Sequence, residues 1–330
     1  MKVHWCTDLF DGLTKTFPPD SEVLYRYIEK HFPEYAVTCA YEAGSFGYKI
    51  ARTLREGGWT CLVVNPADIP RPAKQSLVKT DQIDCINISR QLRNGALRSI
   101  AVPEAEREQA RSLFRRRNDL VKDLHRLKSR IKSILLYYGK EVPEQLDNPN
   151  WSHAFINWLI DVDWEHETAQ QTLDSMIYQY RFVEEELRSV SNSVCAWCRK
   201  HQKKDYNLLR SIPGIGPLTA AALLIEAGDL RRFTSFKQFA SYIGLVPGVY
   251  QSGETYKTLG MNPRAHGLLR SYMIEASWVA VRKDPVLQAY YRKHLGKNSK
   301  RIIVKVARKL LSRTLSVIKQ NQPYQIGIKE

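Results

Sequence analysis

The sequence predicts an α/β domain followed by an all-α region, and three observations support this fold class. Over the first hundred residues, short apolar strand patterns alternate with helical patterns. Two long charged segments, near 104–138 and 173–190, then repeat apolar residues in a three-four alternation that is typical of paired helices. From residue 207 the chain reads as helices separated by glycine-containing turns. We therefore expect three domains, at 1–102, 103–205 and 206–330.

The first domain is expected to have the element order β-β-α-β-α-β-α. MKVHWCTD and LTKTF predict a hairpin around Asp11-Gly12, and the following helix is expected to have Ser21 as its N-cap. YAVTCAYEAG and TCLVVN predict strands on either side of a helix in GYKIARTLREGG. Thr80 is expected to cap a last helix that runs to about Asn94. The last three strands and helices are expected to form a parallel sheet.

The two heptad seams predict helix pairing, either within one chain or between two chains of a dimer. The first seam contains Leu113, Leu120, Leu124, Leu127, Ile131, Ile134 and Tyr138, and the second contains Leu173, Met176, Tyr180, Val183, Leu187 and Val190. Further along, PGIG before an alanine-rich helix resembles the hairpin of helix-hairpin-helix modules, in which backbone N–H groups meet a phosphate. VYQSGETYKTLGMNPRAHG is expected to be a polar loop.

The charge of the chain indicates a polyanionic partner. Its 330 residues have a formal net charge of +16, and runs such as RRR at 115–117 and KNSKR at 297–301 carry part of the excess. Such a surface is typical of nucleic-acid binding, although basic charge can also serve only solubility. No apolar run is long enough to span a bilayer, and the N-terminus lacks the features of a secretion signal. We expect a cytoplasmic protein without membrane partners.

Three carboxylates stand where a catalytic site would be expected. Glu42 ends a predicted strand, and Asp81 and Asp84 begin a predicted helix. Converging carboxylates would suit Mg²⁺. Spacing alone slightly favours the other interpretation, in which the two aspartates only complement the helix N-terminal dipole and Glu42 is an edge carboxylate. CAWC at 195–198 lacks the second cysteine pair of a zinc site. The local sequence around Ser252, QSGE, indicates only a serine in a turn.

Two groups of motifs together resemble a family of bacterial insertion-sequence transposases. The N-terminal group is YEAGSFGYKIARTL, NPADIPRP and VKTDQIDCINISRQLRNG, and the C-terminal group is IPGIGPLTAAALLIEAGDLRRFTSFKQFASYIGLVPGVYQSG and LGMNPRAHGLLRSYMIEASW. The family is that of the DEDD transposases, described as bridge-RNA-guided serine recombinases. The resemblance implies an RNase H-like (RuvC-type) domain, coiled-coil helices, and a helical C-terminal domain with a helix-hairpin-helix-like motif.

Site residues follow from the resemblance by position. Glu42, Asp81 and Asp84 match the metal-binding catalytic acids, and Ser252 matches the proposed nucleophile. The implied partners are donor and target DNA, a structured guide RNA and further copies of the chain as a dimer or tetramer, and the implied location is at the bacterial nucleoid. Nucleic-acid contacts are expected at Lys79, Arg115, Arg116, Gly214, Gly216, Lys257 and Arg264.

The sequence departs from the family pattern at its N-terminus. The family's first catalytic aspartate lies on a strand before KVHW, and here the chain begins at Met1-Lys2-Val3, so we expect the first strand and one metal ligand to be missing. The resulting hypothesis is a chain that binds nucleic acid but is catalytically weak. Two alternatives to the transposase therefore stay open: a non-catalytic nucleic-acid-binding remnant, and a RuvC-like junction nuclease that uses the carboxylates without a serine.

Overall fold

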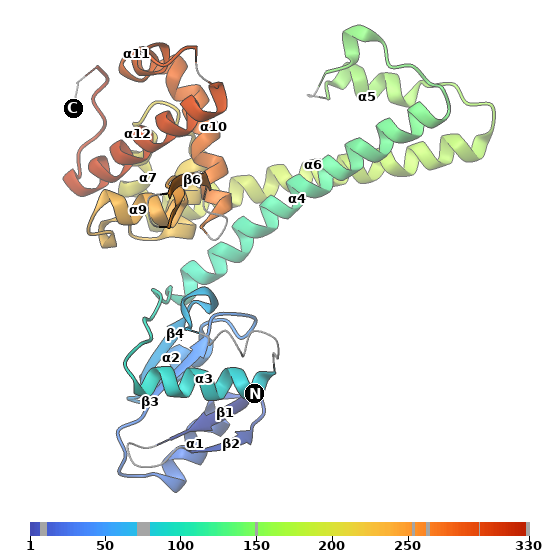
Figure 1. Ribbon diagram of the computed structural model, residues 1–330. Coiled ribbons are helices and arrows are strands. Elements are labelled where there is room, and N and C mark those ends of the chain that lie inside the picture. The colour runs from blue at the N-terminus through green and yellow to red at the C-terminus, as the bar shows by residue number, and fades with distance from the viewer. Residues whose placement is uncertain are drawn as a thin grey trace. The chain divides into compact units, whose positions relative to one another are not determined.

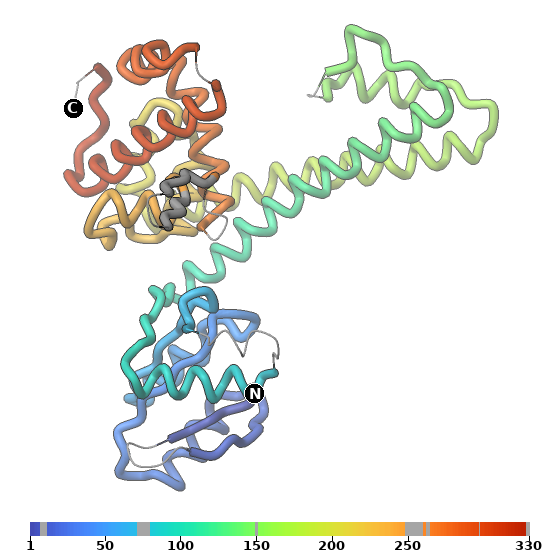
Figure 2. The backbone as a smooth tube through the Cα atoms, in the orientation of Figure 1, coloured from blue at the N-terminus to red at the C-terminus, as the bar shows by residue number. Residues whose placement is uncertain are grey.

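A computed structural model describes residues 1–6, 12–70, 80–148, 151–252, 255–261, 265–296 and 298–327, with the backbone alone at 248–252 and 255–259 (Figures 1 and 2). The chain divides into two compact units, Met1–Glu108 and Gln109–Glu330. The predicted division into three domains, at 102 and 205, stays a prediction. The fold is mixed α/β and mostly helical.

The N-terminal unit begins with the predicted hairpin. Strands β1 (Lys2–Trp5) and β2 (Leu13–Thr16) are antiparallel, with Lys2 opposite Thr16. Helix α1 (Ser21–His31) follows, but its N-cap is Asp20, whose side chain accepts a hydrogen bond from the backbone N–H of Glu22. The prediction of Ser21 as the cap was therefore wrong by one residue. An aspartate and a serine are similarly good N-caps, so their order along the chain could not be decided locally.

A βαβα arrangement completes the N-terminal unit and confirms the predicted element order. Strands β3 (Thr38–Glu42) and β4 (Thr60–Val64) are parallel, and α2 (Lys49–Glu56) connects them. After the short 3₁₀ turn η1 (Pro66–Asp68), helix α3 (Asp81–Arg93) begins at the predicted Thr80 cap, whose Oγ1 lies 3.3 Å from the backbone nitrogen of Ile83.

The predicted parallel sheet of the last three strands was wrong for the described ranges of the chain. There, β1 pairs with β2 and β3 pairs with β4, as two separate two-stranded ladders. β1 and β2 are close in the sequence, which favours antiparallel pairing, whereas the crossover helix α2 places β3 and β4 parallel. Helix α3 packs against both β1 and β3 and so links the two ladders (Figure 1).

Two long antiparallel helices follow, and the unit boundary falls in the first turn of the first of them. Helix α4 (Ala105–Tyr137) matches the predicted range, and after the short η3 (Glu144–Leu146) and α5 (His153–Ile160) the chain returns through α6 (Glu167–His201) (Figure 1). Leu120 and Leu127 of α4 are buried against Val183 of α6. The seams thus pair within one chain, the first of the two predicted options. At the end of the first seam, Leu135 is buried whereas the predicted Ile134 is only half-buried, because a straight helix drifts relative to a 3.5-residue repeat. Tyr138 is exposed, just after the helix ends.

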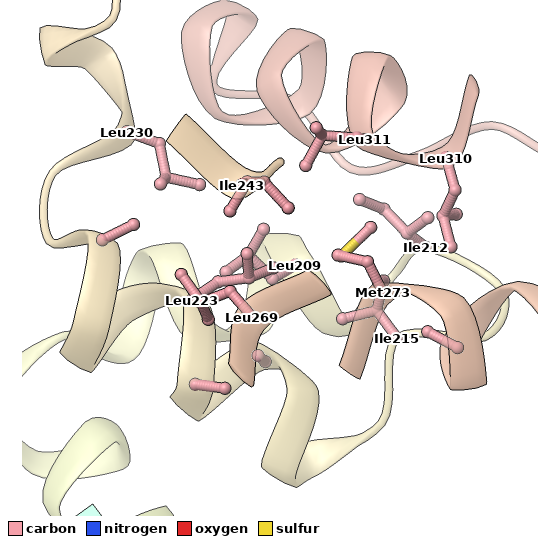
Figure 3. Close-up of a cluster of buried hydrophobic side chains, with 14 of the residues drawn as sticks. Leu209, Ile212, Ile215, Leu223, Leu230, Ile243, Leu269, Met273, Leu310 and Leu311 are labelled. Carbon is pink, nitrogen blue, oxygen red and sulfur yellow. The ribbon is translucent and has the colours of Figure 1, made fainter. Parts of the chain in front are cut away.

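The remainder of the second unit is a helical core with one hairpin. Its elements are α7 (Lys203–Arg210), α8 (Pro217–Ala222), η4 (Leu223–Ala227), η5 (Leu230–Arg232), α9 (Phe236–Ile243), β5 (Pro247–Ser252), β6 (Thr255–Met261), α10 (Gly267–Lys283), α11 (Pro285–Arg292) and α12 (Ser299–Gln320). Figure 3 shows the apolar centre, in which Leu209, Ile243 and Met273 meet Leu310 and Leu311 of α12. Within the described ranges, no helix is long and apolar enough to cross a bilayer.

The hairpin β5–β6 corrects the predicted polar loop. The two strands are antiparallel, with Val249 opposite Thr258 and Ser252 opposite Thr255. Polar residues had favoured a loop, but the segment also contains β-branched and aromatic residues such as Val249, Tyr250 and Tyr256, which form strands readily when a partner strand is available. The prediction of a purely helical C-terminal domain was wrong at this point.

Candidate active site

The predicted catalytic acids of the N-terminal unit lie on two elements that pack together. Glu42 is the last residue of β3 and is half-buried. Asp81 is the first residue of α3 and is exposed, whereas Asp84, one turn later, is half-buried. The two elements are joined by an apolar cluster that includes Ala40 of β3 and Ile88 of α3. The sequence thus placed the acids correctly on their secondary structure elements.

The three acids do not form one ligand group. Among the residues that the structure describes, no three His, Cys, Asp or Glu side chains come close enough together to hold a metal ion. Their carboxylate oxygens nevertheless suit a hard divalent cation such as Mg²⁺. The ligand chemistry therefore fits, although the three carboxylates do not converge on one point. Asp81 and Asp84 also stand in the first turn of α3, where negative charge complements the helix dipole. The structural and the metal-binding interpretations therefore remain compatible.

The predicted nucleophile lies in the second unit. Ser252 is the last residue of β5, and Lys257 lies on β6 opposite Tyr250. Of the other predicted nucleic-acid contacts, Lys79 and Arg264 lie outside the described residues. The next helix along the chain is α10, and its N-cap is His266.

Glu226 is a buried charged residue that the sequence analysis missed. It lies in η4, a single turn of π-helix, and only 2% of its surface is exposed. One carboxylate oxygen lies 3.0 Å from Nε of Arg115, and the other lies 3.3 Å from Nε2 of His266. Arg111 approaches the carboxylate to 3.8 Å and donates hydrogen bonds to the backbone oxygens of Ile225 and Glu226. Three cationic or polar side chains thus converge on one carboxylate, and π-helical turns often mark functional segments.

These contacts determine the charge of Glu226. Burial alone would raise the pKa of its carboxyl group, but hydrogen bonds from His266 and Arg115 outweigh burial and lower the pKa to about 2. His266 also accepts a hydrogen bond at Nδ1 from the backbone N–H of Leu269, so Nε2 carries the proton that points at Glu226. The charged Glu226 carboxylate therefore holds the His266 ring in one orientation. His266 follows the β5–β6 hairpin in the sequence.

The predicted contacts Arg115 and Arg116 have carboxylate partners within the chain. Arg115 binds Glu226, and Nη2 of Arg116 lies 3.1 and 3.2 Å from the two carboxylate oxygens of Glu186 on α6. The side chains of both arginines are still about half exposed or more, at 62% and 49%. Their binding to nucleic acid stays a prediction, although part of their charge is already compensated.

The PGIG turn has a packing role. Gly214 has a φ of +93°, and a Cβ atom there would lie 2.4 Å from the backbone oxygen of Ala276 in α10. Only glycine accepts both the conformation and this close approach. At Gly216, the N-cap of α8, a Cβ would meet nothing within 4 Å. Packing therefore explains the first glycine without a phosphate, whereas phosphate contact at the second stays a prediction.

The CAWC motif lies in the interior of the second unit. Cys195 and Cys198 of α6 are both buried, and burial raises the pKa of the Cys198 thiol to about 12. A thiol of this kind is a core side chain and not a reactive nucleophile.

Comparisons with known proteins bear on both units. A family model described as "Transposase" (DEDD_Tnp_IS110) matches residues 10–139, and one described as "Transposase IS116/IS110/IS902 family" matches residues 206–292. "Putative transposase y4rJ" of Sinorhizobium fredii is 30% identical over 310 residues, which cover 86% of this chain and 76% of the relative. The chain belongs to the IS110/IS116/IS902 transposase family.

Other members of the family share parts of the chain. "Putative transposase y4qE" of the same organism is 32% identical over 240 residues, which are 72% of this chain and 57% of the relative. "Pilin gene-inverting protein" of Moraxella bovis is 32% identical over 179 residues, which are 50% of this chain and 55% of the relative. The chain thus spans little more than half the length of these two relatives. For the N-terminal unit, the DEDD transposase model implies an RNase H-like fold.

Proposed function

We propose that the chain is an insertion-sequence transposase that cleaves DNA and transfers strands. The observation that carries this proposal is the occurrence of both family models on one chain, with Glu42, Asp81 and Asp84 at element ends of the first and Ser252 at a strand end of the second. The net charge of +16 supports a nucleic-acid substrate. A relative named as a pilin gene-inverting protein favours a second candidate, site-specific inversion, which would join two sites on one DNA by the same chemistry.

In the N-terminal unit, we assign a Mg²⁺ site to Glu42, Asp81 and Asp84. A hard cation held there would neutralise developing negative charge on the scissile phosphate. The protein's own contribution is to keep the two aspartates one turn apart on a helix that packs against β3, the strand of Glu42. β1 and β3 each have one partner among the described strands, and one more strand between them would join the two ladders into an RNase H-like sheet.

In the second unit, we assign the nucleophile to Ser252. Its hydroxyl oxygen would attack the phosphorus, forming a serine–phosphate ester and breaking one P–O bond of the DNA backbone. The leaving deoxyribose oxygen would take up a proton. A hydroxyl of a second DNA end would later attack the same phosphorus and release the serine, so the number of phosphoester bonds is conserved.

Specificity and assembly are further parts of the proposal. A structured guide RNA would select the donor and target sites by base pairing, while the basic protein surface binds backbone. Because the carboxylates and the serine belong to different units, the working site would assemble on DNA, and a dimer or tetramer of the chain would bring two DNA molecules together.

A cleavage assay on the complete chain tests the metal site. With a duplex carrying the ends of the encoding element and its noncoding RNA, we expect Mg²⁺-dependent strand cleavage that falls at least about 100-fold in Asp81→Asn and in Asp84→Asn, since each removes one charged metal ligand. The measurement is the initial rate of product formation on a denaturing gel, with and without EDTA.

Glu56→Gln is the matched control. Glu56 is exposed at the end of α2, close to the start of β4, whereas Glu42 lies at the opposite end of the ladder, beside Val64. The Glu56→Gln substitution should leave the cleavage rate unchanged. DNA binding without cleavage by the unaltered chain would favour the non-catalytic remnant, and hydrolysis without any protein–DNA adduct would favour the junction nuclease.

A further inference from the structure

The C-terminal segment carries a positive charge that nothing in its own sequence balances. Residues 285–329 contain eleven lysines and arginines and no aspartate or glutamate. Most of this segment forms α11 and α12. The apolar face of α12 is buried in the core through residues such as Ile303, Val306 and Leu310, so the orientation of the helix is fixed. Figure 3 shows Leu310 and Leu311 in this core.

The opposite face of α12 presents a line of cations. Arg301, Lys305 and Lys309 are exposed and follow one another at four-residue intervals. Four residues of helix advance by about 6 Å, so the three charges extend over about 12 Å along one side of the helix. We call these three residues the α12 basic stripe.

No carboxylate compensates the α12 basic stripe within the described ranges, where no salt bridge involves these three side chains. Nζ of Lys309 lies 4.7 Å from the ring centroid of Tyr290 on α11. The ring leaves the full charge in place and orients the ammonium group. By contrast, the exposed Lys122 of α4 pairs with Asp119 at 2.9 Å.

The arrangement also opposes the stability of the helix. Like charges four residues apart repel each other on a helix surface, by a few tenths of a kcal/mol for each pair. Lys300 and Arg301 stand at the N-terminal turn, where cations oppose the helix dipole and where α12 has no acidic residue. An external polyanion would relieve both effects at once.

We propose that the α12 basic stripe binds the phosphate backbone of duplex DNA. This proposal rests on the proposed action of the chain on DNA, and it assigns a DNA-contacting surface that the sequence motifs did not indicate. Phosphates recur at about 3.4 Å along each strand, so three cations spread over about 12 Å of one helix face can lie beside several consecutive phosphates. Such contacts fix the position of the duplex without reading its sequence, as a guide-dependent enzyme requires.

The test is the salt dependence of DNA affinity in EDTA, measured by fluorescence anisotropy with the complete chain and a random-sequence duplex. Each lost phosphate contact lowers the slope of log K against log salt by about 0.9, so Arg301→Gln/Lys305→Gln/Lys309→Gln should reduce the slope magnitude by about 2.7. The thermal midpoint of this variant should stay the same or rise, because the substitutions remove repulsion between like charges.

A control variant removes the same charge elsewhere. Arg26→Gln/Lys122→Gln/Lys132→Gln neutralises three cations that already pair with Glu22, Asp119 and Asp147, and it should keep the slope of the unaltered chain. An unchanged slope in the stripe variant, or an equal decrease in the control, would overturn the proposal. A decrease seen with an RNA duplex but not with DNA would overturn the assignment to DNA. Since no cleavage is measured, failure of the proposed catalysis would appear separately, in the Mg²⁺ assay.

Discussion

Asp284→Ala is expected to lower the free energy of unfolding of the second unit by about 4 kcal/mol, because it leaves a buried arginine uncompensated. Asp284 is 1% exposed, and its Oδ2 lies 2.7 Å from Nη1 of Arg313 and 2.6 Å from the hydroxyl oxygen of Tyr324. Its Oδ1 accepts hydrogen bonds from the backbone N–H groups of Val286 and Leu287 and so caps α11. One carboxylate therefore holds α11, α12 and the C-terminal segment together.

Urea denaturation monitored by circular dichroism measures this effect. Tyr324→Phe removes a single hydrogen bond to the carboxylate and should cost only about 2 kcal/mol. Asp284→Ala/Arg313→Met removes both buried charges and should recover part of the loss, since the uncompensated guanidinium is then gone. If the single variant Asp284→Ala lost less than about 1 kcal/mol, the carboxylate would not be the centre of this network.

The second large effect is expected at Glu226, and it depends on pH. The pKa of Glu226 is lowered to about 2 in the folded chain, so the unfolded chain takes up the proton first as the pH falls. The stabilisation is thus complete above about pH 5 and is lost as the pH approaches 2. A shift of this size corresponds to about 3 kcal/mol. Glu226→Gln should therefore be less stable than the unaltered chain by about that amount at pH 7, and the difference should vanish toward pH 2.

Denaturation curves at several pH values test this prediction, and Glu186→Gln is the matched control. Glu186 also pairs with an arginine, Arg116, but its side chain is 32% exposed. A partly solvated ion pair of this kind contributes less than about 1 kcal/mol. A difference between Glu226→Gln and the unaltered chain that stayed constant from pH 7 to pH 2 would show that shape, and not charge, explains the role of Glu226.

Elements with local signals could be predicted from the sequence. The β1–β2 hairpin, the parallel pair of β3 and β4 around α2, and the Thr80 cap of α3 each depend on residues within a short window. Heptad spacing likewise predicted the pairing of α4 with α6, although it could not decide between one chain and two. The β5–β6 hairpin was missed because polar residues and glycines outnumber the β-branched and aromatic residues in this segment, and such a composition favours a loop.

The ionic centres could not be predicted, because their members lie far apart in the sequence. Glu226 meets Arg115, 111 residues earlier, and Asp284 meets Arg313, 29 residues later. No periodicity marks such pairs, and a buried carboxylate in LLIEAGD looks like an ordinary helical glutamate. For Asp81 and Asp84, spacing alone slightly favoured the helix dipole over a metal, and the resemblance to the family made metal binding the stronger hypothesis.

The central claim is that one chain combines metal-binding carboxylates with a nucleophilic serine, and trapping of a covalent intermediate tests it most directly. The complete chain is incubated with labelled duplex carrying the element ends, the noncoding RNA and Mg²⁺, then denatured and digested. We expect a DNA adduct on the peptide that contains Ser252, and none in Ser252→Ala, which should still bind the duplex. An adduct of equal yield in Ser252→Ala, or cleaved DNA without any adduct, would contradict the claim.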